Sequence, residues 1–354
     1  MEAKLKKAIF MIAAAALALA GCQGQDGAGG GAGDARSQIR IVGSSTVYPF
    51  TTAVAERFAQ ANPRFDAPIV ESTGTGAGVE LFCAGVGVQH PDVTNASRRI
   101  KASELAECNA NGVNQVIEVP VGIDGLVFIQ ANGAQPIPLT LEDVYSALAA
   151  TPYGEPNTAK TWQDVNPELP AVAIKVYGPP PTSGTRDALA EMILEKGCTT
   201  NADMKALKDS DEDRYKQVCT KIREDGAYVE AGENDNLLVQ KVAANPGSVG
   251  VMGYSFLDEN TDKVRGLTLN GVTPTYETIS GFDYPGARPL YIYAKGEHVA
   301  AVPGLREFLA EYASAWGDKG YLAERGLVAS PADVQASAKA AITSLTPVSA
   351  SELK

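Results

Sequence analysis

Histidine is scarce in this sequence, whose 354 residues include only His90 and His298. Both are predicted to lie in polar surface loops, and no two cysteines are close enough to form a typical zinc motif, so we expect no metal site. A serine hydrolase would need a base and a nucleophile elbow, and neither is evident. Gly74, Gly76 and Gly78 have the wrong spacing for a dinucleotide-binding fingerprint. The sequence therefore indicates no catalytic residue and no cofactor, and a secreted hydrolase is a secondary alternative.

Positive charge is also in short supply. The chain has 30 Lys and Arg residues against 42 Asp and Glu residues, which gives a formal net charge of −12. A protein that binds nucleic acid needs a basic face, so nucleic acid is not an expected partner. A small anion would have to bind against the overall field, which requires short hydrogen bonds at a local site.

The apolar run over residues 8–20 falls short of the roughly 20 residues of a membrane span. It follows three lysines and ends in Leu19-Ala20-Gly21-Cys22, the pattern of a bacterial lipobox. We therefore expect residues 1–21 to be a lipoprotein signal peptide and Cys22 to be lipidated. Residues 22–38, mostly Gly, Ala, Asp and Gln, are predicted to form a flexible tether. The protein would then be exported and lipid-anchored at the periplasmic face of a bacterial membrane, either inner or outer.

Few cysteines remain after such processing. An even number in an oxidising compartment favours disulfides, with buried free thiols as the alternative. Four cysteines allow three connectivities, and proximity in the sequence suggests the pairs Cys83–Cys108 and Cys198–Cys219.

Short apolar runs alternate with helical patterns over residues 39–354, which is typical of an α/β fold. These roughly 315 residues are too many for one typical core, so two domains are expected. Strands are predicted at 39–42, 67–72, 116–119, 125–129, 173–177, 249–252 and 290–293. Helices are predicted at 51–60, 101–108, 141–148, 187–195, 237–244 and 304–316, with another following residue 78 and a solvated helical excursion within 203–230.

Three loops rich in small hydroxyl residues each follow a predicted strand and precede a predicted helix. Glycines let the backbone approach a ligand, and unpaired N–H groups at a helix start bind oxyanions. The third helix is expected to start at about Ser183, so Arg186 lies in its first turn, where a cation is misplaced unless an anion is bound beside it. The candidate binding residues are Ser45 and Thr46 in the first loop, Thr75 in the second, Ser183, Gly184 and Thr185 in the third, and Ser97 and Arg98 in a fourth loop.

Proline-rich connectors and the Tyr284-Pro285-Gly286 segment are the places where we expect the chain to cross between domains. Two crossings imply a hinge with two segments. The ligand would then be enclosed between two lobes, with the first, second and fourth loops on one side and residues 183–186 on the other.

In this order along the chain, the motifs resemble those of the phosphate-binding proteins of ABC transporters. The resemblance covers nearly all of the chain after residue 38 and rests on residues 43–50, 72–78, 95–98, 121–125 and 182–187. It implies an α/β, two-lobed periplasmic-binding-protein type II fold with a two-segment hinge. One lobe would comprise residues 39–121 and 287–354, and the other residues 122–286. It also implies a monomer that captures inorganic phosphate and delivers it to the permease subunits of the transporter.

The resemblance further implies roles for individual residues. The first loop would supply the hydroxyl of Thr46 and the N–H of Val47, with Ser45 beside them. The second loop would supply the hydroxyl of Thr75, and the third would supply Ser183, Gly184 and Thr185.

Two positions depart from the pattern of the family. Arg98 stands where well-known members carry an aspartate that accepts the proton of hydrogen phosphate, and Pro179 stands where they carry an arginine. Arg98 and Arg186 are the expected sources of positive charge, and Asp124 is the candidate proton acceptor. Another oxyanion, such as sulfate, is therefore an alternative ligand.

Overall fold

Three short parallel strands begin the fold of the computed structural model, which describes residues 36–232, 234–317 and 320–353. Strand β1 (Arg40–Gly43) lies between β2 (Ile69–Ser72) and β3 (Val93–Ala96). All three are four residues long. The buried side chains of β1 are apolar, whereas β3 buries two apolar and two polar side chains. Because the strands are parallel, their carboxyl ends lie at one edge of the sheet.

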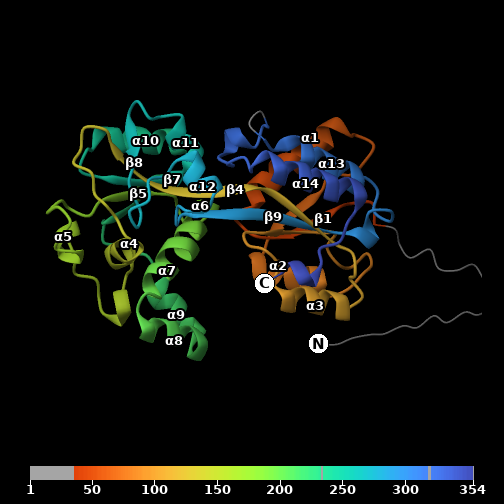
Figure 1. The fold of residues 1–354 in the computed structure, drawn as a ribbon, viewed down its shortest axis with the longest axis horizontal. Coiled ribbons are helices and arrows are strands. Elements are labelled where there is room, and N and C mark those ends of the chain that lie inside the picture. Colours follow the sequence, from red (N-terminus) through yellow and green to blue (C-terminus); the bar gives the residue numbers. More distant parts are fainter. Residues whose placement is uncertain (1–35, 233, 318–319, 354) are drawn as a thin grey trace, which may run out of the picture. The chain divides into compact units, whose positions relative to one another are not determined.

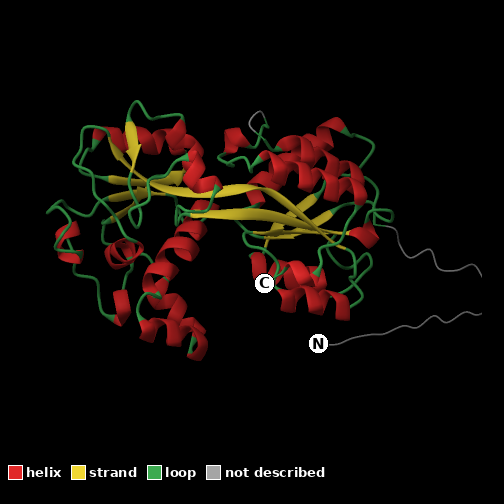
Figure 2. Cartoon of the chain, in the orientation of Figure 1, coloured by secondary structure: helices red, strands yellow, loops and turns green. Residues whose placement is uncertain are grey.

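Two long antiparallel strands, β4 (Val116–Ala131) and β9 (Ala287–Lys295), continue this sheet and run side by side (Figure 2). The predicted strands 116–119 and 125–129 are therefore one strand. The register shifts between Pro120 and Gly122, and this irregularity accommodates the proline within a paired strand. Further along, β4 pairs with β7 (Val249–Gly253) and β8 (Val264–Gly266). Strand β7 also pairs in parallel with β5 (Val176–Gly178), and β5 pairs in parallel with β6 (Tyr228–Glu230).

Helices cover both faces of the sheet around β1 and β9 (Figure 1). Helices α1 (Tyr48–Ala61), α13 (Leu305–Ala315) and α14 (Ala332–Ser344) lie over one face. Phe58 of α1 meets Phe308 of α13 edge-on in this core, with 5.7 Å between ring centroids. Helices α2 (Thr75–Cys83) and α3 (Ala102–Ala110) cover the other face, where the predicted disulfide Cys83–Cys108 joins them.

A separate hydrophobic core surrounds β5, β7 and the far end of β4. The predicted helix 187–195 is part of a longer helical run whose middle turn is π-helical, and the predicted disulfide Cys198–Cys219 ties its end to α9. The helices of this part are α4 (Leu141–Leu148), α5 (Trp162–Val165), α6 (Gly184–Ala188), the π-helix η2 (Leu189–Leu194), α7 (Glu195–Cys198), α8 (Ala202–Ser210), α9 (Glu212–Cys219), α10 (Asp235–Ala244), α11 (Tyr254–Asp258) and α12 (Tyr276–Ser280). Short 3₁₀ turns are η1 (Pro152–Gly154), η3 (Gly296–His298), η4 (Ala323–Arg325) and η5 (Ala350–Glu352).

The surface position predicted for His298 is wrong. This side chain is 3% exposed, because turn η3 folds back from β9 against the beginning of β3. Its Nδ1 lies 2.7 Å from a carboxylate oxygen of Asp92, and its Nε2 accepts the N–H of Gly87 at 3.0 Å. The ring is thus a buried structural link, whereas His90 is half-buried.

No helix within the described residues is both long and apolar enough to span a membrane. The predicted signal peptide, the lipidation site Cys22 and residues 23–35 of the predicted tether lie outside the described residues.

Candidate anion-binding site

The loops that follow the parallel strands β1, β2 and β3 meet at one edge of the sheet. The N–H groups of Thr73 and Gly74 each donate to the carbonyl of Gly43 at 2.9 Å, and Ser44 N–H donates to Asn95 O at 2.9 Å. A Cβ on Gly78 would lie only 2.4 Å from the Cα of Gly43, so the glycine permits this close approach. The structure therefore brings together the first, second and fourth predicted loops.

The second and fourth loops are joined directly by their hydroxyl residues. The Oγ1 atom of Thr75 lies 3.0 Å from the Oγ of Ser97 and also accepts the Ser97 N–H at 3.1 Å. Thr75 is half-buried and Ser97 is buried, so this pair forms a fixed corner at the carboxyl edge.

The loop after β5 supplies the opposite side of the site. Ser183 is the N-cap of α6, and its Oγ accepts the Thr185 N–H at 3.2 Å. Gly184 and Thr185 are the first residues of the helix, so no carbonyl one turn earlier can accept their N–H groups. Asp187, which follows in the same turn, accepts a hydrogen bond from the Oγ of Ser45.

Gly184 lies directly against the first loop. The Oγ1 of Thr46 is 3.5 Å from the carbonyl oxygen of Gly184, and a Cβ on Gly184 would lie 2.8 Å from the Cα of Thr46. The first and third loops, which are separated by more than 130 residues in the sequence, are thus in contact.

A cavity of about 100 Å³ lies where these loops converge. Of the predicted residues, it is lined by Thr46, Asp124, Ser183, Gly184 and Thr185. Further lining residues, which the sequence reasoning did not include, are Pro49, Phe50, Asp235, Gly253, Phe256, Arg325 and Gly326. The side chain of Val47 is buried in the core instead, and its N–H points to the Oγ of Ser44 at 3.4 Å.

Arg288, which the sequence did not predict, bonds to two of the predicted cavity residues, although the arginine in the cavity lining itself is Arg325. Arg288 lies on β9 directly opposite Asp124 on β4, and only 12% of its side chain is exposed. Its guanidinium donates to the Oγ1 of Thr46 at 2.8 Å, to Asp124 at 3.2 Å and to Glu191 at 2.5 Å. One feature of the sequence points to Arg288. It follows the segment where the chain was expected to cross between domains for the second time, and it lies just before a predicted strand.

Two opposing effects act on the pKa of the Asp124 carboxyl. Burial raises the pKa of the Asp124 carboxyl, and the charge and hydrogen bond of Arg288 act in the opposite direction. The carboxylate has oxygen lone pairs available beside hydroxyl donors, so it can accept a proton from a ligand.

The two arginines expected to supply positive charge are engaged elsewhere. Arg98 makes a bidentate pair with Glu104, at 2.6 and 2.9 Å, and this partner raises the pKa of the guanidinium. Arg186 donates to the carbonyl of Pro179 at 3.2 Å and lies over the ring of Tyr228, 4.4 Å from its centroid. Neither arginine is among the residues that line the cavity.

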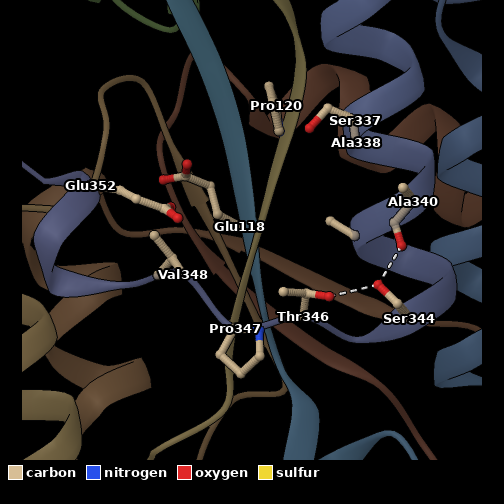
Figure 3. Close-up of a pocket in the computed structure, with 11 residues that line it drawn as sticks. Glu118, Pro120, Ser337, Ala338, Ala340, Ser344, Thr346, Pro347, Val348 and Glu352 are labelled. Atoms are coloured by element: carbon tan, nitrogen blue, oxygen red, sulfur yellow. Dashed lines mark hydrogen bonds between the residues drawn. The ribbon is translucent and has the colours of Figure 1, made fainter.

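A wider hollow of about 300 Å³ lies between α14 and β4 (Figure 3). Its lining includes Glu118 and Glu352, and no basic residue among those that the structure describes. Glu118 already accepts hydrogen bonds from Arg99 at 3.0 Å and from the hydroxyl of Tyr293 at 2.9 Å. This hollow is therefore a poor place for an anion. Within the described parts of the chain, no group of three or more His, Cys, Asp or Glu residues is arranged to hold a metal ion.

The chain matches the family model described as PBP superfamily domain over residues 29–315. Protein SphX of Synechococcus elongatus is 32% identical to it, across 78% of this chain and 73% of that protein. The phosphate-binding protein PstS of Staphylococcus saprophyticus is also 32% identical, across 90% of this chain and 87% of that protein.

Solved structures agree with this relationship. The crystal structure of a possible phosphate binding protein from Planctomyces limnophilus aligns with a TM-score of 0.71 and 29% identity, covering 87% of this chain and 98% of that chain. The fold is the type II periplasmic-binding-protein fold that the sequence predicts. The chain therefore belongs to the PBP superfamily and, within it, to the PstS family of substrate-binding proteins.

Proposed function

We propose that this protein binds inorganic phosphate and delivers it to the permease subunits of an ABC transporter. The observation that carries the proposal is the arrangement of Arg288, Asp124 and Thr46 beside a cavity whose opposite side is the start of α6. Relatives over most of the chain are named as phosphate-binding proteins, which supports the same ligand. The family consists of substrate-binding proteins, and we infer that this member has no catalytic activity.

The proposed binding scheme gives each group one task. Arg288 supplies positive charge from beside Thr46 and Asp124, and the hydroxyls of Thr46, Ser183 and Thr185 together with the N–H of Gly184 donate to phosphate oxygens. Asp124 accepts a proton from the anion. The other residues predicted from the sequence have no direct contact with phosphate in this scheme. Ser45, Thr75 and Ser97 hold the loops through the contacts described above, and Val47, Arg98 and Arg186 are engaged elsewhere.

We also propose that phosphate is enclosed between two lobes, residues 39–121 with 287–354 and residues 122–286. The division is supported by the hydrophobic cores: one core draws on residues 123–284 together with Val328, and the other two draw on residues outside 122–286. With these bounds, the chain passes between the lobes within β4 and again directly before β9.

We further propose that the protein is a monomer, is exported with residues 1–21 as its signal peptide, and is anchored at the periplasmic face of the membrane through lipid on Cys22. The lipobox pattern supports this assignment. A Cys22→Ser variant is expected to accumulate as unprocessed precursor, and membrane-extractable protein of mature size from this variant would contradict the lipid anchor.

Isothermal titration of the purified protein with phosphate and with sulfate tests the proposed ligand. Phosphate is expected to bind and sulfate is not. Arg288→Ala is expected to weaken phosphate binding by roughly 2–5 kcal/mol, because it removes the charge and leaves Asp124 buried without its partner.

Arg98→Ala is the matched control, since the guanidinium of Arg98 is bonded to Glu104, whereas that of Arg288 is bonded to the lining residues Thr46 and Asp124. It is expected to leave the affinity almost unchanged. A wild-type protein that binds sulfate in preference to phosphate would reject the proposed ligand. Equal losses in the two variants would reject the assignment of Arg288.

A further inference from the structure

Asp235 is a second acidic residue in the cavity lining, and the binding scheme above gives it no task. It is the first residue of α10, and the N-cap side chain of Asn234 accepts the N–H of Leu237 at 3.1 Å. The start of this helix is thus fixed next to the cavity. Among the described residues, the Asp235 carboxylate has no hydrogen-bond or ion-pair partner.

The charges around this cavity are unfavourable for a doubly charged anion beside an ionised Asp235. Arg288 is already paired with Asp124 and Glu191, so most of its charge is compensated, and the charge of Arg325 is weakened by solvent because this side chain is exposed. Two carboxylates and a dianion in a cavity of about 100 Å³ would repel one another strongly. Of the other charged residues, Asp124 from β4 and Arg325 from η4 line the cavity. Arg288 from β9 pairs with Asp124 and with Glu191 from η2, and Asp187 from α6 bonds to Ser45.

We propose that Asp235 shares a second proton with the bound anion, so that the site holds phosphate in its doubly protonated, singly charged form. One proton lies between phosphate and Asp124, and the other lies between phosphate and Asp235. No bond to phosphorus changes, and the second proton comes from solvent. The inference rests on the proposed function, because it concerns how that same site holds phosphate.

The environment of Asp235 suits this exchange of a proton near neutral pH. Burial raises the pKa of Asp235 to about 7, and no partner charge opposes that effect. Above this pH, both free phosphate and Asp235 have lost the proton that the complex requires. Binding must then take up one proton, and the affinity is expected to fall about tenfold for each further pH unit.

Titration calorimetry at about pH 8.5, in two buffers with different ionisation enthalpies, measures the number of protons taken up with each phosphate. The wild-type protein is expected to take up about one proton, and Asp235→Asn about none, since the neutral amide needs no proton to face the anion. Asp235→Asn is also expected to bind phosphate at least tenfold more tightly than wild type at this pH. Asp235→Ser, a second neutral variant, is expected to lose the uptake as well.

Asp203→Asn is the matched control, because Asp203 is an exposed acid in the first turn of another helix that an asparagine caps. It is expected to behave as wild type. Unchanged proton uptake in both Asp235 variants would overturn the role of Asp235 while leaving phosphate binding intact. A wild-type protein that does not bind phosphate would overturn the proposed function itself, and this inference with it.

Discussion

At the scale of single residues, Gly184 marks the closest approach of the first and third loops. A Cβ at this position would lie 2.8 Å from Thr46 Cα and 2.9 Å from Ser45 O, and these backbone atoms cannot move aside cheaply. Gly184→Ala is therefore expected to weaken phosphate binding by roughly 1–3 kcal/mol while leaving each core intact. Calorimetric titration, together with thermal unfolding in the absence of phosphate, measures the two effects separately.

Gly76→Ala is the control for this substitution. Gly76 lies in the first turn of α2, and an added Cβ there would meet no atom within 4 Å. Its phosphate affinity is expected to match wild type. If Gly184→Ala also binds like wild type, the contact between the two loops is not needed for binding.

Asp124 allows a second test at this scale, namely the discrimination between phosphate and sulfate. Sulfate carries no proton near neutral pH, so a buried carboxylate repels it but accepts a proton from phosphate. At about pH 6 the carboxyl of Asp235, whose pKa is about 7, is mostly protonated and does not add to this repulsion. Under these conditions Asp124→Asn is expected to keep phosphate binding but to lose its preference over sulfate.

Competition calorimetry with phosphate in a large excess of sulfate measures this preference. The wild-type protein is expected to show an unchanged phosphate affinity, and Asp124→Asn an affinity that falls as sulfate is added. A variant that still ignores sulfate would eliminate Asp124 as the discriminating residue.

Hydroxyl residues of the cavity could be predicted from the sequence because each belongs to a local strand, loop and helix pattern. Ser183, for example, caps the helix that its own segment begins. Arg288 could not be predicted in this way, since its partners Thr46, Glu191 and Asp124 are 242, 97 and 164 residues away. Arg98 was expected to supply charge to the anion, but it pairs instead with Glu104, which is only six residues away. The two opposite charges are thus paired within one segment of the chain.

At the scale of elements, the disulfide Cys198–Cys219 holds the charged excursion formed by α8 and α9. Helix α8 has no fully buried residue, and its packing against the core is limited to the partly buried Met204 and Leu207. Replacing both cysteines by alanine is expected to lower the free energy of unfolding by about 3 kcal/mol, because the unfolded chain gains freedom in a loop of this length. Neither cysteine lines the cavity, so the phosphate affinity is expected to stay within twofold of wild type.

Denaturant unfolding of the double variant and the wild type measures this stability difference. Because both cysteines are fully buried, small cavities left by alanine add to the loss. An unchanged unfolding midpoint would show that the excursion does not depend on the bridge.

Element boundaries were predictable wherever an apolar pattern ended at a turn residue. The predicted helix 141–148 has the same bounds in the structure because the side chain of Thr140 caps its first turn through Asp143. Strand β4 was predicted in two pieces because Pro120 and Gly122 interrupt its pattern. Pairing with β9 across a shifted register carries the strand through both residues, and such pairing with a distant segment leaves no local sequence signal.

At the scale of the whole folded chain, several contacts connect the two proposed lobes besides β4 and β9. Ser45 donates to Asp187, Thr46 Oγ1 lies near Gly184 O, and Arg288 pairs with Glu191. Each contact joins a group from residues 39–121 or 287–354 to a group from residues 122–286. A ligand that bonds to both sets would favour the arrangement in which these contacts form.

This coupling predicts that phosphate makes the molecule more compact in solution. In the proposed scheme, phosphate would stabilise only conformations in which Arg288, from one proposed lobe, and the start of α6, from the other, reach it together. The radius of gyration from small-angle scattering is therefore expected to fall as phosphate is added. Gly184→Ala is expected to show a smaller decrease at equal occupancy, since its added methyl group keeps the loops apart. A radius that does not change at saturating phosphate, with binding established by calorimetry on the same sample, would reject the hinge and leave a rigid site.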